Sequence, residues 1–322
     1  MATPRKRTGK FSVNVSVDDR TGQGTLYVVG TPIGNLQDMT LRAIATLRSV
    51  DLIACEDTRH THKLLQHFQI TTPQISYHHH NRQQRLPELM ARLKSGQAIA
   101  LVSDAGMPTI ADPGLELVQA CIAAEIPVVP IPGVSASLSA LVASGLDTER
   151  FVYEGFLPLD HKGRSRLEQL SCEQRTMIFY AAPHHLVQTL RMLADSLGQE
   201  RRLAIARELT KIHEQFWRGT LGEAIAYFST HPPKGEFTLV VAGAPAPAIV
   251  WSEATLQGEL GRLLEEGLSV AMASKQLAEI TGLPRRQLYN LALQITAKSS
   301  DTFTLNFPEQ YCSREKRWHP VR

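Results

Sequence analysis

The chain has few cysteines, and they are far apart. There are four among 322 residues, at Cys55, Cys121, Cys172 and Cys312. Zinc sites and the disulfide frameworks of small secreted domains depend on cysteines at short, paired spacings. The scattered positions therefore argue against both, and favour a reducing compartment.

Long hydrophobic runs are also missing. No apolar stretch approaches the roughly 20 residues that a membrane-spanning helix needs. The N-terminal segment MATPRKRTGK is basic but lacks the apolar core of a secretory signal. We therefore expect a cytoplasmic protein.

An excess of charge of either sign is missing outside the N-terminus. The formal charge is +3, and residues 1–24 supply all of it with five Lys or Arg against two Asp. Net charge alone therefore does not predict a nucleic-acid partner. We expect residues 1–24 to form a disordered basic tail.

The two common nucleotide-binding signatures are absent as well. No G-x-G-x-x-G follows a predicted strand, and no G-x-x-x-x-G-K-[ST] occurs in the chain. These absences count against a dehydrogenase, a kinase and the usual Rossmann methyltransferase.

What the chain does contain is an alternation of short apolar strands and helices. Because buried parallel strands have this pattern, it predicts an α/β fold. An N-terminal lobe is expected over 25–146 and a second α/β lobe over 147–243. The first lobe's strands are predicted at 26–29, 51–55, 98–102 and 127–130, with helices at 58–68 and 112–124. The second lobe's strands are predicted at 151–156, 176–180, 203–206 and 236–241.

The pattern changes after a linker rich in Ala and Pro at 242–248. Only helices are predicted beyond it, at about 253–266, 269–281 and 284–297. These define a small module resembling a helix-turn-helix at 253–297. Residues 298–322 show no clear period and are expected to be a tail.

Three loops of the first lobe are rich in glycine, proline and serine. They span 30–36, 103–114 and 130–137, and each follows a predicted strand. Ligands of open α/β sheets bind at the carboxyl edge of the strands, where bare backbone approaches them closely. One such loop is an ordinary turn, but three at one edge predict a ligand.

Five motifs occur in order along the chain: GTPIGNL at 30–36, EDTR at 56–59, SDAGMP at 103–108, DPG at 112–114 and ARELTK at 206–211. Together they resemble the family of 16S ribosomal RNA (cytidine 2′-O) methyltransferases, in the tetrapyrrole-methylase superfamily. The resemblance covers roughly residues 25–297. It implies a two-lobed homodimer that binds S-adenosylmethionine between its lobes and methylates small-subunit ribosomal RNA.

The resemblance also implies a set of cofactor-binding residues. In the first lobe these are Gly30, Pro32, Asp104, Gly106, Pro108, Ile110, Ser135 and Ala136. In the second lobe they are Tyr180, Ala206, Lys234 and Gly235.

Substrate chemistry is expected at Glu56, Asp57 and Arg59. A carboxylate there could accept the ribose hydroxyl proton while the arginine holds a phosphate. In the alternative reading, Asp57 caps the helix and pairs with Arg59. Glu208 and Lys211 have the same two interpretations: they take part in catalysis, or they form only an ion pair.

The run Tyr77-His78-His79-His80-Asn81 invites a metal hypothesis, which we set aside. Adjacent histidines on an extended segment point to alternate faces, so they cannot all bind one ion. The chain also departs from the family in three places. The family has an acid where His79 stands, and Glu-Ser-Pro-His-Arg where this chain has Ala181 to His185. It has a run of small residues where this chain has Val134 to Ser137.

The helical module places Arg285 and Arg286 at the start of its last helix, where they could meet RNA phosphates. A methyltransferase of a corrin or porphyrin precursor is the alternative function. The EDTR motif and the helical module, both features of the RNA branch, argue against it. A DNA-binding regulator is a third hypothesis, against which the balanced charge of the module argues.

Overall fold

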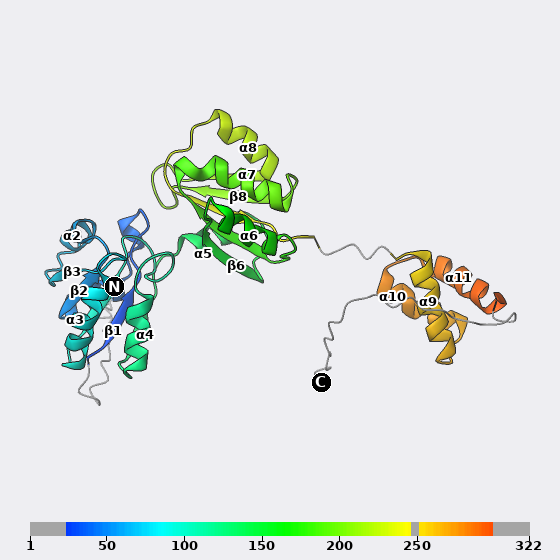
Figure 1. Ribbon diagram of the computed structural model, residues 1–322, viewed down its shortest axis with the longest axis horizontal. Helices are drawn as coiled ribbons and strands as arrows, with labels where there is room; N and C mark the ends of the chain where they lie inside the picture. Colours follow the sequence, from blue (N-terminus) through cyan, green and yellow to red (C-terminus); the bar gives the residue numbers. More distant parts are fainter. Residues whose placement is uncertain (1–23, 246–250, 299–322) are drawn as a thin grey trace, which may run out of the picture. The chain divides into compact units, whose positions relative to one another are not determined.

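The computed structural model describes residues 24–245 and 251–298. The chain divides after residue 245 into two compact units. Among these described residues, the first unit contains two sheets with their helices and the second contains three helices, which Figure 1 shows as separate parts of the chain. Except for residues 24 and 298, the predicted tails lie outside the described residues. Because both sheets belong to one unit, the boundary at residue 147 stays a prediction.

The first sheet is entirely parallel, with strand order β3-β2-β4-β1-β5. The central strands β1, β2 and β4 are buried along their whole length, as their apolar sequences require. All five carboxyl ends lie at one edge, which brings the glycine-rich loops together. The strands are β1 (Leu26–Val29), β2 (Leu52–Cys55), β3 (Gln74–Ser76), β4 (Ile99–Val102) and β5 (Val128–Ile131).

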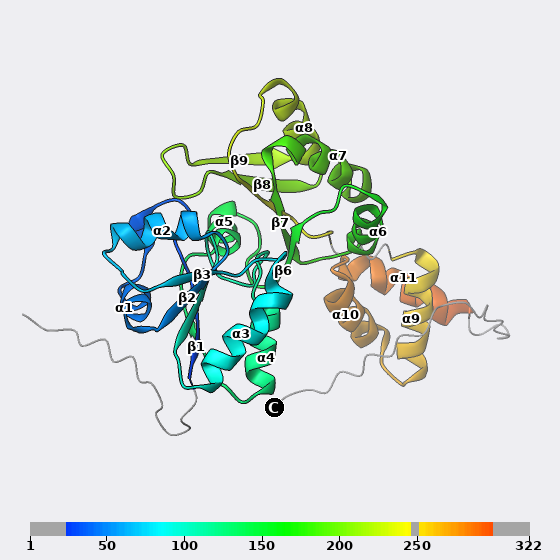
Figure 2. The same ribbon diagram turned by 60° about the vertical axis from the view of Figure 1, so that its left-hand side comes forward.

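Helices cover both faces of this sheet (Figure 2). Helices α1 (Leu41–Ser49) and α2 (Thr58–His67) pack on one face, and α3 (Arg82–Lys94) and α4 (Leu115–Ala123) on the other. A 3-10 turn, η1 (Leu36–Asp38), precedes α1. The lobe is therefore a doubly wound α/β layer.

The second sheet is mixed, with strand order β6-β7-β10-β8-β9. Only β6 and β7 are parallel, and β10 and β9 run antiparallel to their neighbours. The strands are β6 (Phe151–Phe156), β7 (Thr176–Ala181), β8 (Arg202–Arg207), β9 (Gln215–Thr220) and β10 (Phe237–Val241).

This sheet is also covered on both faces. Helices α6 (His161–Leu170), α7 (Leu186–Leu197) and α8 (Leu221–Thr230) share one core with it. A 3-10 turn, η2 (Pro183–His185), precedes α7. Helix α5 (Ala136–Ser144) packs on the opposite face through Ala140 and Leu141. The first-lobe residue Ile33 joins that core, so α5 and the loop after β1 connect the two sheets.

Three details of the secondary structure differ from the prediction. Strands β3 and β9 were missed because both are edge strands whose polar residues dilute the apolar pattern. The helix expected from residue 112 begins at Leu115. It starts late because Gly114 has φ +138°, which no helix accommodates.

The second unit is a bundle of α9 (Glu253–Glu265), α10 (Val270–Thr281) and α11 (Arg285–Lys298). Its core is built mainly from leucines such as Leu260, Leu277 and Leu288. Gly282, with φ +70°, ends α10 as predicted. No helix among the described residues is long and apolar enough to span a membrane.

Candidate functional site

A cavity of about 350 Å³ lies where the carboxyl edge of the first sheet meets the second sheet. We call it the central cavity. Its walls are the loops after β1, β4 and β5 and residues of β7, β8 and β10. The structure brings six predicted cofactor residues together here: Gly106, Ile110, Ser135, Ala136, Tyr180 and Ala206.

The other predicted cofactor residues lie elsewhere. Pro32 and Asp104 line a pocket of about 240 Å³ beside α2. Lys234 lines a third pocket, in the second lobe. Gly30, Pro108 and Gly235 line none of these three pockets. A cofactor role stays a prediction for all of the predicted cofactor residues, those of the central cavity included.

Glycines bring together the loops that line the central cavity. A Cβ atom on Gly30 would lie 2.7 Å from the Cα of Gly133, so the two loops meet backbone to backbone. Gly106 has φ +82° and exchanges two backbone hydrogen bonds with Thr31, at 2.9 and 3.0 Å. Because this left-handed backbone favours glycine, residue 106 fixes the shape of the cavity wall.

Asp112 is a wall residue that the sequence did not single out as a site residue. Burial, and after it the nearby charge of Glu56, raise the pKa of Asp112 to about 6. Burial also raises the pKa of Glu56, with a contribution from Asp104. The cavity thus carries a carboxyl group suited to accept a proton near neutral pH.

The sequence did contain a signal for Asp112, namely the Asp-Pro-Gly motif at 112–114. The motif could not show where the side chain lies, because residue 112 was expected to open a helix. In the structure the loop continues to Gly114, and Asp112 lies on the cavity wall instead.

Asp57 and Arg59 form a closed pair at the start of α2. The Asp57 carboxylate accepts hydrogen bonds from the Arg59 backbone N–H at 2.8 Å and from its Nε and Nη2 atoms at 3.1 and 2.7 Å. These bonds from Arg59 hold the pKa of Asp57 well below its usual range. The geometry is that of a helix cap with an ion pair, the alternative interpretation of the sequence. The Arg59 side chain is 89% exposed, and its catalytic role stays a prediction.

Lys211 connects the two lobes. Its Nζ donates to Glu208 Oε1 at 2.9 Å and to Glu236 Oε2 at 3.0 Å. A Cβ atom on Gly34 of the first lobe would lie 2.4 Å from Lys211 Cγ, so the lysine stem covers that glycine. Both Glu208 and Lys211 line an open cleft of about 810 Å³. The ion pair is present, and a catalytic role for either residue stays a prediction.

The histidine run is organised by hydrogen bonds within its own segment. Asn81 accepts from the His78 backbone N–H at 2.8 Å and donates to Ser76 at 3.0 and 3.1 Å. Tyr77 is fully buried in the first-lobe core. No group of His, Cys, Asp or Glu suited to a metal ion occurs among the described residues.

The departure at Ala181-Ala182 lies on the central cavity. Both alanines and Pro183 line its wall, whereas His184 and His185 are exposed. The carboxylate that the resembling family carries here is therefore absent from the cavity wall of this chain. This leaves Asp112 and Glu236 as the carboxylates of the wall.

The two arginines predicted to contact RNA are accessible. Arg285 and Arg286 are exposed in the first turn of α11, and Arg285 Nη2 donates to the Ala271 carbonyl at 3.3 Å. Neither forms an ion pair with a described carboxylate. Contact of these arginines with RNA stays a prediction.

Comparison with known families assigns both units of the chain. Residues 25–225 match the family described as Tetrapyrrole (Corrin/Porphyrin) Methylases. Residues 252–296 match the RsmI C-terminal HTH domain. The predicted combination of a tetrapyrrole-methylase fold with a C-terminal helical module is thereby confirmed.

Two curated relatives carry the name ribosomal RNA small subunit methyltransferase I. The protein of Synechocystis sp. is 62% identical over 276 residues, covering 85% of this chain and 99% of its own. The protein of Halalkalibacterium halodurans is 47% identical over 281 residues, covering 86% of this chain and 97% of its own.

A solved structure shares the fold alone. The uroporphyrin-III-C-methyltransferase of Thermus thermophilus is 21% identical with a TM-score of 0.51. The match covers 68% of this chain and 94% of that one. A fold shared at this distance does not identify a substrate.

Proposed function

This chain belongs to the family of ribosomal RNA small subunit methyltransferase I, and from that membership we propose that it methylates small-subunit ribosomal RNA with S-adenosylmethionine as methyl donor. The proposed acceptor is the 2′-oxygen of a cytidine. The observation that supports the proposal most strongly is the 62% identity to a relative of that name over nearly its entire length.

The central cavity suits the methyl donor. Gly106 presents bare backbone on its wall, and the close contact of Gly30 with Gly133 brings the loops after β1 and β5 together. A ligand held by backbone hydrogen bonds requires such accessible backbone. Ser135 adds a hydroxyl, and Tyr180 an aromatic wall. When bound there, S-adenosylmethionine would supply an electrophilic methyl group for a single displacement.

The protein would then orient the ribose and take up its proton. An oxygen nucleophile must lie in line with the bond that breaks, so the lobes must position the nucleotide at the cavity. We propose Asp112 as the proton acceptor, with burial and the nearby Glu56 holding its affinity for a proton high. Asp57 suits this task less well, because three hydrogen bonds from Arg59 occupy its carboxylate.

Substrate binding would extend beyond the cavity. The exposed guanidinium of Arg59 and the arginine pair of α11 are suited to phosphate contacts. The match of 252–296 to the RsmI C-terminal HTH domain supports a role of this module in binding RNA.

Replacing Arg59 by alanine is expected to lower kcat/KM for RNA about tenfold, because one phosphate contact is lost. Affinity for S-adenosylmethionine, measured by calorimetry, is expected to stay unchanged. Thermal stability should fall little, because an ion pair this exposed contributes little to folding. A large loss of cofactor affinity in Arg59→Ala would contradict the assignment.

We also propose a cytoplasmic homodimer. The cytoplasm fits an enzyme of ribosomal RNA, and α5 carries two exposed apolar side chains one turn apart. Leu138 is 48% exposed and Val142 76% exposed, which suits a subunit interface. Val142→Asp is expected to yield monomers in analytical ultracentrifugation, with Lys162→Asp on exposed α6 as control. An unchanged dimer would place the interface elsewhere.

The function is tested by methyl transfer from labelled S-adenosylmethionine to small ribosomal subunits from a strain lacking this protein. The expected product is a nuclease-resistant dinucleotide containing a ribose-methylated cytidine. Label in a base would refute the 2′-oxygen. No incorporation into subunits or free RNA, despite cofactor binding, would favour a small-molecule substrate.

A further inference from the structure

The second lobe contains an aromatic pocket that the proposed chemistry does not use. It has a volume of about 270 Å³ and lies between the end of α8 and the strands β8 and β9. Its aromatic rings belong to Phe216, Trp217, Tyr227, Phe228, His231 and Phe237. Phe237 lines both this pocket and the central cavity, so the two are neighbours in the fold.

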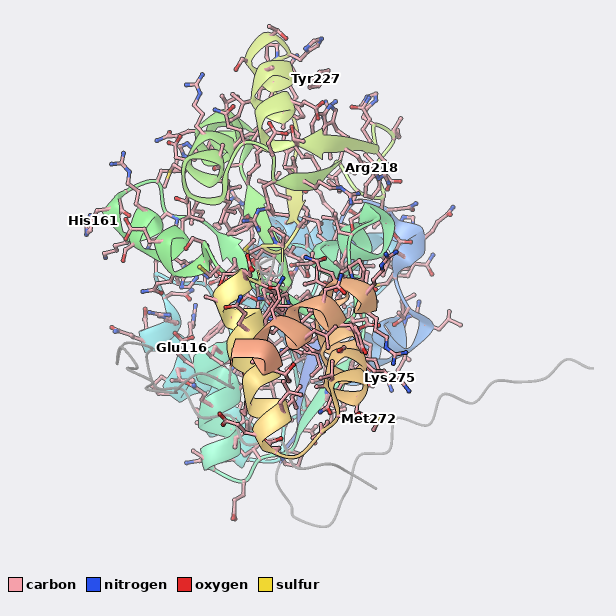
Figure 3. The ribbon with its side chains drawn as sticks, turned by 90° about the vertical axis from the view of Figure 1, so that its right-hand side faces the viewer. Glu116, His161, Arg218, Tyr227, Met272 and Lys275 are labelled. Carbon is pink, nitrogen blue, oxygen red and sulfur yellow. The ribbon has the colours of Figure 1, made fainter. Side chains whose placement is uncertain are left out.

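Two of the rings form a fixed platform. Tyr227 and His231 are stacked with ring centroids 4.3 Å apart and an interplanar angle of 8°. His231 Nδ1 lies 3.0 Å from both the Tyr227 carbonyl oxygen and Thr230 Oγ1, which holds the imidazole in place. Tyr227 is nevertheless 42% exposed, on the surface of α8 (Figure 3). An ordered, accessible aromatic surface binds a planar ligand with little loss of side-chain entropy.

The charge around the pocket is positive. Arg207 and Lys234 line it, and no Asp or Glu does. Arg207 donates to the Lys234 carbonyl oxygen at 2.7 Å and to Gln215 Oε1 at 2.9 Å, which orients its guanidinium without neutralising it. Within 24–245 and 251–298, neither cation forms an ion pair with a carboxylate.

We propose that the aromatic pocket binds an unpaired nucleotide of the RNA substrate, outside the site of methyl transfer. The base would stack on the Tyr227–His231 platform, and Arg207 and Lys234 would hold its phosphate. Proteins bind single-stranded RNA by this combination of aromatic stacking and positive charge. The inference rests on the proposed function, since it takes RNA as the substrate.

A direct test uses binding of a short, fluorescently labelled single-stranded RNA to the full-length protein. Tyr227→Ala is expected to weaken binding about tenfold, because one stacking contact is lost. Tyr227→Phe keeps the ring and should bind like the wild type. Equal affinity of Tyr227→Ala and wild type, with equal melting temperatures, would overturn the proposal.

Charge at the pocket is tested by Lys234→Ala against Lys162→Ala, which removes an exposed lysine from α6. Only Lys234→Ala should weaken RNA binding and reduce its salt dependence. Calorimetry with S-adenosylmethionine accompanies both variants. A loss of cofactor affinity in Lys234→Ala would assign this lysine to the cofactor and contradict the subsite.

Steady-state kinetics distinguish a role of the pocket in RNA binding from a role in methyl transfer. With small-subunit substrate, Tyr227→Ala should raise KM for RNA about tenfold and leave kcat unchanged. Normal binding of naked RNA combined with a raised KM for subunits would indicate contact with a ribosomal protein and refute the nucleotide assignment. Failure of the proposed function would appear instead as RNA binding by the wild type without methyl transfer.

Discussion

Replacing Asp112 by asparagine is expected to lower kcat for methyl transfer about 100- to 1000-fold, while affinity for S-adenosylmethionine changes by less than about twofold. Asparagine has nearly the same shape but cannot accept the ribose proton. Single-turnover methyl transfer and calorimetry measure the two quantities. Asp195→Asn, on the exposed face of α7, is the control for a lost carboxylate.

The same variant should change the pH dependence. Because the pKa of Asp112 is raised to about 6, the wild-type rate should rise between pH 5 and pH 7 as the carboxyl group ionises. Asp112→Asn should lack that limb. A normal rate, or a loss of rate that follows loss of cofactor binding, would contradict a role of Asp112 in proton removal.

The stability of the fold should change with pH in the direction opposite to the rate. A carboxyl group whose pKa is higher in the folded than in the unfolded chain binds its proton more tightly when folded. It therefore destabilises the fold as pH rises from about 4 through about 6. Asp112→Asn should raise the melting temperature at pH 8 and leave it unchanged at pH 4. Increased stability with lost activity is typical of a functional group in an unfavourable position.

Replacing Gly106 by valine is expected to weaken S-adenosylmethionine binding at least about 100-fold. A β-branched residue strongly disfavours the left-handed backbone at this position, so the loop after β4 should move. The Cβ atom itself would meet Ile33 and Val134 at ordinary contact distances of 3.5 and 3.6 Å, and the added methyl groups would extend beyond it. Calorimetry measures the affinity.

Gly145 is a matched control for Gly106. It has φ +77°, and a Cβ atom there would meet nothing within 4 Å. Gly145→Val therefore introduces a similar backbone strain away from the central cavity. It should lose stability comparably and keep cofactor affinity. If Gly106→Val and Gly145→Val bound S-adenosylmethionine with equal affinity, residue 106 would not shape the cofactor site.

The main strands could be predicted because each is a short apolar run that ends at glycine, proline or a polar residue. The edge strand β9 was missed because none of its residues is fully buried and its polar residues interrupt the apolar pattern. Antiparallel pairing of β8 with β9 and β10 was not predicted either. It depends on contacts between segments far apart in the chain, which local patterns do not encode.

Only part of the candidate site could be predicted, because the rest also depends on contacts between distant segments. The loop glycines and serines of the first lobe carry a local signal, and most of the cavity's first-lobe lining follows from it. Tyr180 and Ala206 were named only through the family resemblance. The Asp-Pro-Gly motif marked the loop of Asp112 but not the position of its side chain, and the Tyr227–His231 platform gave no signal. Both environments exist only after the lobes have folded.

A crystal structure with bound S-adenosylhomocysteine tests the central claim most directly. The account predicts the product in the central cavity, contacting Gly106, Ser135 and Ala136, with its sulfur on the side of Asp112. Binding in the open cleft beside Lys211, or in the aromatic pocket, would contradict the assignment of the cofactor site.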